Sequence, residues 1–364
     1  MGFKCGIVGL PNSTKTTLFN ALTRSQAETS LTSSGKVEVH AASVDVPDPR
    51  VAVLSDLFQP KKTTYARVQY SDIAGLRASS GKESALDSQL LNKLSQSDAL
   101  LHVVRAFEDD KIPHPEGSVN AVRDLATLEF EFLISDLGIV ERRLERLRHD
   151  LERKGSYPTR TQDQVEVGLM EKLKEALEGE QPVRSLEFSA EEERILKGFQ
   201  FLTAKPALIA LNVGDEGSED PGDFSIEVNP KDKIVCLHGS LEMEISQLSG
   251  EDSDLFLSEY GIQEPGLNRM IRLSYELLGL QSFFTVGEDE VRAWTIPQGA
   301  TAVEAAGVIH SDLARGFIRA EVVSYQDLVN AGSLAEARNR GLLRLEGKEY
   351  IVKDGDILNI RFNI

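Results

Sequence analysis

The sequence predicts an α/β fold built on a doubly wound parallel sheet. Five apolar runs of strand length recur along the chain, and helical or loop stretches separate them. Strands that alternate with helices are typical of a parallel sheet covered by helices on both faces. The expected strands cover residues 3–9, 66–72, 99–107, 207–212 and 233–238.

Length and composition limit the class of protein. The 364 residues suggest two or three folding units, because one domain usually has roughly 100–200 residues. Hydrophobic residues make up 41% and charged residues 27%, which excludes a disordered or collagen-like chain. The formal charge is −18, so the overall field repels nucleic acid and any contact with RNA needs a local basic patch.

The cysteines and the apolar runs indicate a cytoplasmic protein. Cys5 and Cys236 each lie in an apolar run, as expected for reduced, buried thiols. No apolar run is long enough to cross a bilayer, so no membrane association is expected. The first residues also lack the features of a signal peptide.

A helical hairpin is expected between the third and fourth strands. Apolar residues from Ala126 to Leu151 follow the 3,4 spacing of a coiled-coil seam. Residues 155–158 break this pattern, and a weaker helical pattern returns from Val165 to Ala176. An antiparallel coiled-coil hairpin inserted over about residues 120–202 is the simplest arrangement.

The C-terminal part of the chain predicts a small α+β unit. Strand patterns at 291–296 and 317–323 flank a helical pattern at 303–309. A final strand with alternating apolar residues covers 358–364 and follows a turn at Asp354-Gly355.

The segment from Gly9 to Thr17 lies between an expected strand and an expected helix, the context of a Walker A phosphate loop. In such a loop Lys15 would meet the β- and γ-phosphates and Thr16 would meet Mg²⁺. Thr14 replaces the second glycine, and a β-branched residue is poorly suited to that position. The motif alone is equally consistent with an ordinary strand-to-helix turn. The candidate phosphate-binding residues are Asn12, Ser13, Thr14, Lys15, Thr16 and Thr17.

Two later patterns stand in the order found in G-proteins. Asp72 ends an expected strand in a DxxG pattern, in which the carboxylate holds Mg²⁺ through water and the Gly75 N–H meets the γ-phosphate. Residues 212–215 follow another strand, where a G-protein reads the base. Three patterns in this order at the ends of strands favour a nucleotide site.

The sequence resembles the YchF family of Obg-related P-loop ATPases over nearly its whole length. The resemblance implies a P-loop G-domain over 1–119 and 203–280, an inserted coiled-coil hairpin over 120–202, and a C-terminal β-grasp (TGS, ubiquitin-like) domain over 281–364. The matching segments are GLPN, KTTLFNALT, VPDPR at 46–50, QPKKT at 59–63, DIAGL at 72–76, HVVRAFED at 102–109, ELLGLQSFFTVGEDEVRAWTIPQG from 276, AAGVIHSDLARGFIRAEV and RLEGKEYIVKDGDILNIRFN.

The resemblance also implies ATP as the ligand, with Mg²⁺. Family members carry NVxE in place of the NKxD of G-proteins, and Asn212, Val213 and Asp215 stand at these positions. Because the side chain of Asp215 is shorter, GTP also remains open as the preferred nucleotide. A loop histidine takes over the orientation of water in the family, and His114 matches it, so Lys15 and His114 are the catalytic candidates. By sequence alone, a histidine between two prolines is more often solvent-exposed.

Three departures from the family pattern concern the nucleotide. Thr14 replaces a glycine, Lys36 falls at the switch threonine, and residues 77–85 retain a single glycine. Hydrolysis is therefore expected to be slow or absent. The alternative to an ATPase is a non-hydrolysing paralogue that acts as an RNA- or ribosome-binding adaptor.

The resemblance implies contact with the ribosome through the hairpin and the TGS domain. A basic stripe of the hairpin and scattered arginines of the last domain suit RNA phosphates. A solvated coiled-coil face balanced by glutamates is the slightly favoured alternative for the stripe. The sequence does not specify an oligomeric state. The stripe residues are Arg142, Arg146, His149 and Arg153.

Overall fold

The computed structural model describes residues 3–24, 38–74, 88–153, 158–215 and 217–363. The chain divides into two compact units, one with residues 3–42 and 69–270 and the other with residues 43–68 and 271–364. The expected boundaries placed 43–68 in the P-loop domain, and that three-domain division stays a prediction. None of the described helices is long and apolar enough to cross a membrane.

The first unit is built on a six-stranded sheet in the order β2-β4-β1-β5-β6-β7. β1 pairs in parallel with β4 and β5, and parallel pairing continues from β5 to β6 and β7. Every residue of β5 and β6 is buried, as expected for parallel strands covered on both faces. The strands are β1 (Lys4–Val8), β2 (Glu38–Asp45), β4 (Arg67–Ala74), β5 (Ala99–Arg105), β6 (Ala207–Asn212) and β7 (Lys233–Leu237).

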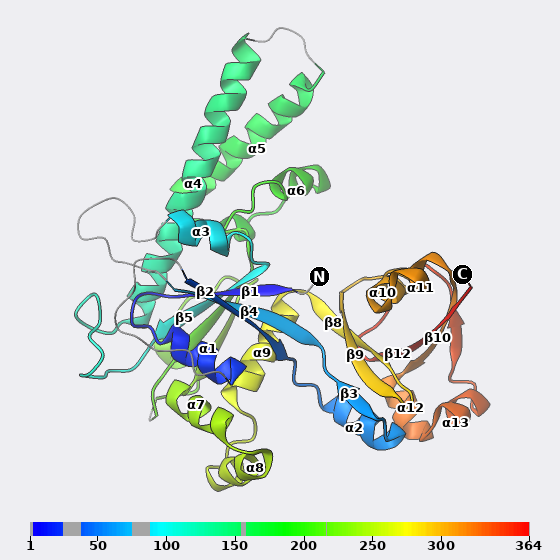
Figure 1. Ribbon diagram of the computed structural model, residues 1–364. Helices are drawn as coiled ribbons and strands as arrows, with labels where there is room; N and C mark the ends of the chain where they lie inside the picture. Colours follow the sequence, from blue (N-terminus) through cyan, green and yellow to red (C-terminus); the bar gives the residue numbers. More distant parts are fainter. Residues whose placement is uncertain (1–2, 25–37, 75–87, 154–157, 216, 364) are drawn as a thin grey trace. The chain divides into compact units, whose positions relative to one another are not determined.

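Helices cover both faces of this sheet. Figure 1 shows α1, α7 and α8 on one face and α3 with the long helices on the other. The expected doubly wound arrangement is thus present. The helices are α1 (Lys15–Thr23), α3 (Ser88–Leu94), α4 (Ala121–Arg153), α5 (Arg160–Glu178), α6 (Ala190–Leu196), α7 (Gly239–Gln247), α8 (Gly250–Glu259) and α9 (Gly266–Leu277), with 3₁₀ turns η1 (Val183–Ser185) and η2 (Pro221–Phe224).

The expected helical hairpin consists of α4 and α5, which lie side by side (Figure 1). From Leu133 to Leu147 the 3,4 pattern forms a buried seam, whose α4 residues share a core cluster with Leu169 and Leu173 of α5. Ala126 and Phe130, the first two residues of the expected seam, are exposed instead. At its base, Asp136 of α4 is fully buried and accepts hydrogen bonds from Leu202 and Thr203, which lead into β6. The hairpin is therefore fixed to the sheet by a polar contact as well as by apolar packing.

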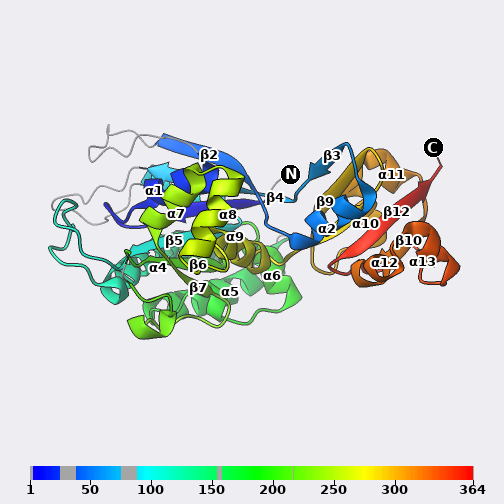
Figure 2. The ribbon, with the colours of Figure 1, turned by 90° about the horizontal axis from the view of Figure 1, so that it is seen from below.

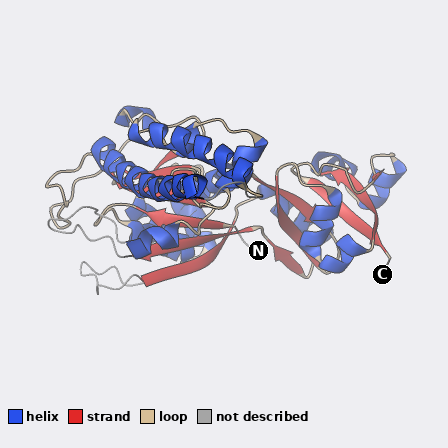
Figure 3. Cartoon of the chain, turned by 90° about the horizontal axis from the view of Figure 1, so that it is seen from above, coloured by secondary structure: helices blue, strands red, loops and turns tan. Residues whose placement is uncertain are grey.

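The second unit is built on a sheet in the order β11-β10-β12-β8-β9-β3. Figure 2 labels β3, β9, β10 and β12 of this sheet, and Figure 3 shows its strands in red and its helices in blue. α10 packs against one face of the sheet through Ala302, Ala305 and Ala306, in a core that includes Phe283 and Leu358. Its strands are β3 (Lys62–Thr64), β8 (Leu280–Thr285), β9 (Glu290–Pro297), β10 (Phe317–Ser324), β11 (Arg344–Glu346) and β12 (Asp356–Phe362). Its helices are α2 (Pro49–Phe58), α10 (Ala302–Ile309), α11 (Ser311–Arg315), α12 (Tyr325–Ala331) and α13 (Leu334–Asn339).

The segment 43–68 joins the second unit through specific contacts. β3 adds to the sheet by parallel pairing with β9. Arg50 at the start of α2 forms ion pairs with Asp48 at 2.8 Å and with Asp354 at 2.7 Å. Its guanidinium also lies 5.1 Å from the centroid of the Phe284 ring. These partners explain why the VPDPR segment belongs with the C-terminal strands.

Candidate functional site

The loop between β1 and α1 has backbone angles that are unfavourable for some of the residues it contains. Asn12 and Thr14 have positive φ angles of 60° and 68°, in the left-handed region. Asparagine tolerates this region, but a β-branched threonine does not. Gly9 is required because a Cβ there would collide with the Val103 carbonyl oxygen and lie 2.6 Å from Ser13 Oγ. The loop therefore has the backbone conformation of a phosphate loop, and Thr14 is strained in this conformation.

Lys15 folds back over this loop. Its Nζ donates hydrogen bonds to the carbonyl oxygens of Gly9 at 2.9 Å and Leu10 at 2.8 Å. Burial lowers the pKa of Lys15 to about 8, and the nearby Asp72 carboxylate opposes that shift. An ammonium held by two neutral carbonyls is available to a stronger anionic acceptor.

Thr16 and Asp72 meet beside Lys15. Thr16 Oγ1 donates to Asp72 Oδ2 at 3.1 Å, and Asp72 is 1% exposed. Burial raises the pKa of Asp72, while the Lys15 charge opposes the shift. Asp72 Oδ1 is buried and has no hydrogen-bond partner among the described residues. A hydroxyl beside a carboxylate with an unpaired oxygen is the donor set expected around Mg²⁺.

The remaining residues of the phosphate loop differ in exposure. Ser13 is 5% exposed, and its Oγ is buried without a partner among the described residues. Thr17 is half-buried in the first turn of α1. Asn12 Nδ2 donates to the Pro113 carbonyl oxygen at 2.9 Å, which connects the phosphate loop to the loop that carries His114. The predicted residue Gly75, with Leu76, Lys36 and 77–85, lies outside the described residues.

Asn212 connects the phosphate loop to the start of α7. Its Nδ2 donates to Thr14 Oγ1 at 2.7 Å, and its Oδ1 accepts from the Gly239 N–H at 2.9 Å. Val213 is buried, whereas Asp215 is exposed. Of the three predicted base-reading side chains, only Asp215 is open to solvent.

His114 is not the solvent-exposed loop residue that sequence alone favours. Its side chain is 6% exposed, and its Nε2 lies 2.9 Å from Asp124 Oδ2. Its Nδ1 accepts a hydrogen bond from the Glu116 N–H at 3.2 Å. Both ring nitrogens therefore face protein groups, and His114 must leave Asp124 before Nε2 can orient a water molecule.

Sequence reasoning missed Arg105, which shapes the His114 loop. This residue ends β5 and is 2% exposed. Its guanidinium donates to the carbonyl oxygens of Phe107 at 2.9 Å and Ile112 at 2.7 Å. No carboxylate pairs with it among the described residues. The signal was present in HVVRAFED, as an arginine at the end of an apolar strand.

The turn after β7 was also missed. His238 Nδ1 contacts the Gly214 carbonyl oxygen, and its Nε2 lies 3.3 Å from Glu219 Oε1. A Cβ at Gly239 would lie 2.7 Å from Asn212 Nδ2, so only glycine fits beside that amide. His238 and Gly239 thus fix the 212–215 segment at the edge of the sheet.

Known proteins resemble this chain along its full length. The "Ribosome-binding ATPase YchF" of Bacillus subtilis is 42% identical, and the match covers 100% of both chains. The chain belongs to the YchF family. The protein of the same name from Escherichia coli O157:H7 is 41% identical over 100% of both chains.

A solved structure and two family descriptions agree with this membership. The "Structure of the Schizosaccharomyces pombe YchF GTPase" superposes with a TM-score of 0.87 at 32% identity, covering 99% of this chain and 98% of that one. Residues 280–363 match the family YchF-GTPase_C, "Protein of unknown function (DUF933)", and residues 4–130 match MMR_HSR1, "50S ribosome-binding GTPase". The predicted P-loop fold with a C-terminal YchF domain is thereby confirmed.

Proposed function

We propose that this YchF-family chain binds ATP and Mg²⁺ at the β1–α1 loop and associates with ribosomes. The observation that carries the nucleotide site is the convergence of Lys15, Thr16 and Asp72 on one loop, with distances of 2.8–3.1 Å between their polar atoms and their partners. The relatives named as ribosome-binding ATPases support the same activity for this chain.

Thr16 and Asp72 would hold the Mg²⁺. The ion would neutralise charge on the phosphates when bound. No group of three or more His, Cys, Asp or Glu side chains among the described residues could hold a metal alone. We therefore expect tight Mg²⁺ binding only together with the nucleotide.

The choice of ATP over GTP depends on the 212–215 segment. Val213 is buried and has no charge to offer the base, and the Asn212 amide is occupied by Thr14 and Gly239. Asp215 remains as the exposed carboxylate that could accept from guanine. Calorimetric titration with ATP and with GTP, each with Mg²⁺, tests this preference.

Slow hydrolysis follows from the position of His114. Lys15 would stabilise charge on the transferred phosphoryl group, and His114 would orient the attacking water after separating from Asp124. The non-hydrolysing adaptor is the second candidate function. The strained Thr14 and the paired His114 favour it, because both restrict the nucleotide site.

One experiment separates the two candidates. Saturable ATP binding followed by phosphate release, both lost in Lys15→Ala, would support the ATPase. Binding without release would leave the adaptor, gated by nucleotide. No saturable binding of either nucleotide would refute the proposed nucleotide site.

Ribosome association is proposed for the hairpin and the C-terminal unit. On α4, Arg143 and Arg148 are neutralised by Glu166 and Glu171 of α5, each at 2.6–2.8 Å. Arg142 and Arg146 are exposed and have no ion-pair partner among the described residues. The charges of these two arginines are therefore available to RNA phosphate.

A further inference from the structure

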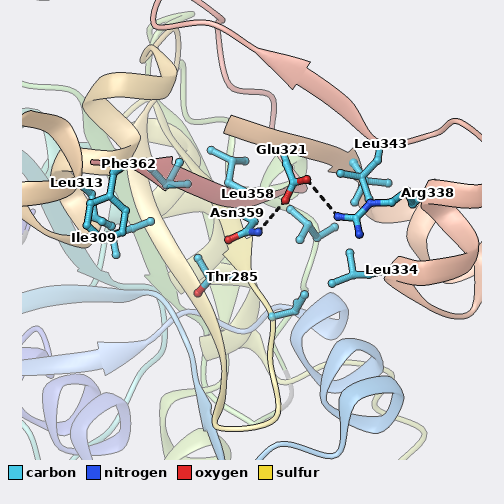
Figure 4. A pocket seen from close by; sticks show the side chains of 14 residues that line it. Thr285, Ile309, Leu313, Glu321, Leu334, Arg338, Leu343, Leu358, Asn359 and Phe362 are labelled. Carbon is cyan, nitrogen blue, oxygen red and sulfur yellow. Dashed lines mark hydrogen bonds and ion pairs between the residues drawn. The ribbon is translucent and has the colours of Figure 1, made fainter. Parts of the chain in front are cut away.

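A pocket of about 330 Å³ lies within the C-terminal unit (Figure 4). Figure 4 shows Ile309, Leu313 and Phe362 together on one side of it and Leu334 and Arg338 on the other. Its volume is in the range of ligand pockets, and it belongs neither to the nucleotide site nor to the hairpin.

The pocket lies where β12 continues beyond the end of its neighbour β8. The two strands share a single register pair, Ile357 with Phe284, and β8 ends at Thr285 while β12 continues to Phe362. On its other side β12 pairs with β10 as far as Phe362. Beyond Ile357, the edge of β12 that faces away from β10 therefore has no strand partner among the described residues. Such an edge is a template for an added strand.

Residues from both faces of β12 line the pocket, as expected for a cavity that follows the edge of a strand. Leu358 and Ile360 point to the α10 face, whereas Ile357 and Asn359 alternate to the other face. On the α10 face the lining is apolar, with Ile309 of α10 in contact with the core.

The opposite face combines apolar side chains, among them Val323, Leu334 and Leu343, with a charged cluster. The Glu321 side chain is 7% exposed and is shared by two guanidinium groups, those of Arg338 at 3.1 Å and Arg361. Asn359 donates to the other carboxylate oxygen at 2.8 Å. Arg319 lies directly opposite Arg361 in the β10–β12 pair, so two like charges face each other. Two arginines that share one glutamate leave a net positive charge at the rim of this face.

We propose that the edge of β12 binds an extended acidic peptide segment of a partner protein as an added strand. Successive side chains of a strand point to opposite faces. A peptide that alternates apolar and acidic residues would place the former in the apolar part of the pocket and the latter beside Arg338 and Arg361. Backbone hydrogen bonds would supply affinity and the pocket would supply specificity. Single-stranded RNA fits less well, because it needs aromatic stacking platforms and Phe362 is the only aromatic side chain among the described residues that line the pocket.

The test uses the isotope-labelled full chain and a synthetic, N-acetylated, C-amidated hexapeptide of alternating glutamate and valine. We expect saturable binding, with NMR shift changes and slowed amide exchange at residues 358–362. The same peptide N-methylated at every residue should bind at least about tenfold more weakly, because none of its amides can then donate a strand hydrogen bond. Equal binding of the two peptides, or shift changes confined to other residues, would overturn the proposal.

Two matched variants test the charge. Arg338→Gln should weaken binding of the peptide several-fold, and Arg340→Gln should not, because Arg340 lies on the same chain segment but outside the pocket and pairs with Glu336. Thermal melting of each variant checks folding. An oligouridine that shifts residues 358–362 when the hexapeptide does not would assign the edge to RNA and refute the peptide.

Discussion

A substitution at Thr14 can test whether backbone strain in the phosphate loop lowers its affinity for nucleotide. A threonine at φ 68° carries a strain of roughly 1–2 kcal/mol, which glycine would not. Thr14→Gly also removes the hydrogen bond from Asn212, worth about 1 kcal/mol, so the two effects on stability nearly cancel. We expect Thr14→Gly to bind ATP several-fold more tightly with little change in melting temperature. Calorimetry measures the former, and an unchanged or weaker affinity would show that the strain does not oppose binding.

Lys15 should give nucleotide binding a pH dependence. Its pKa is lowered to about 8, so the neutral amine accumulates as the pH rises through that value. Below about pH 8 the affinity for ATP should not depend on Lys15 titration, and above it the Kd should rise, at most about tenfold per pH unit. Since phosphate favours the charged form, binding near pH 9 should take up a proton. Calorimetry in two buffers of different ionisation enthalpy measures this uptake, with Lys15→Ala as the control that lacks it.

The motifs named candidate side chains of the nucleotide site but not the contacts that those side chains make. The motifs placed the phosphate loop after β1 and Asp72 near the end of β4, and the structure brings Thr16 and Asp72 together, because these parallel strands end at one edge of the sheet. The motif could not show that Asn212 binds Thr14, or that Arg105 holds the His114 loop. The Asn212–Thr14 contact joins residues 198 positions apart, so no local pattern encodes it. The contact of Arg105 with Ile112 spans only seven positions, but it depends on how the loop after β5 folds back on the strand end.

At the scale of elements, the apolar patterns located five of the six strands of the first sheet and the hairpin, and β2 was not expected. They did not locate β3, a short strand with exposed or half-buried residues. They also could not assign α2 to the C-terminal unit, because Arg50 depends on Asp354, far away in the sequence. Elements held by a buried stripe were therefore predictable, and those held by distant ion pairs were not.

The contact of Asp136 that fixes the hairpin to the sheet should make the free energy of unfolding depend on pH. Burial raises the pKa of Asp136 to about 6, although hydrogen bonds from Thr203 and Leu202 oppose the shift. The unfolded value is about 3.9, so Asp136 contributes stability that is complete below about pH 4 and is lost as the pH rises through 6. The loss should reach about 3 kcal/mol at most.

Asp136→Asn should remove this dependence. At about pH 4 the variant should be less stable than wild type, because an amide NH₂ cannot accept the hydrogen bond that a carboxylate oxygen accepts from the Thr203 N–H. The difference in unfolding free energy between the two proteins should shrink as the pH rises from about 4 to 7. Denaturant titrations followed by circular dichroism measure it, and a constant difference would mean that Asp136 does not titrate in this range.

For the whole molecule, a formal charge of −18 repels RNA, so any contact with RNA depends on local arginines that attract phosphate. Arg146 is unpaired among the described residues, whereas Arg148 on the same helix is paired with Glu171 of α5. If the hairpin meets RNA phosphate, Arg146→Gln should weaken ribosome co-sedimentation and lower the slope of log K against log salt by about 1. Arg148→Gln removes the same charge and should leave that slope unchanged, since its guanidinium already has a carboxylate partner. Equal effects of the two variants would show that net charge, rather than a phosphate contact at Arg146, governs the association.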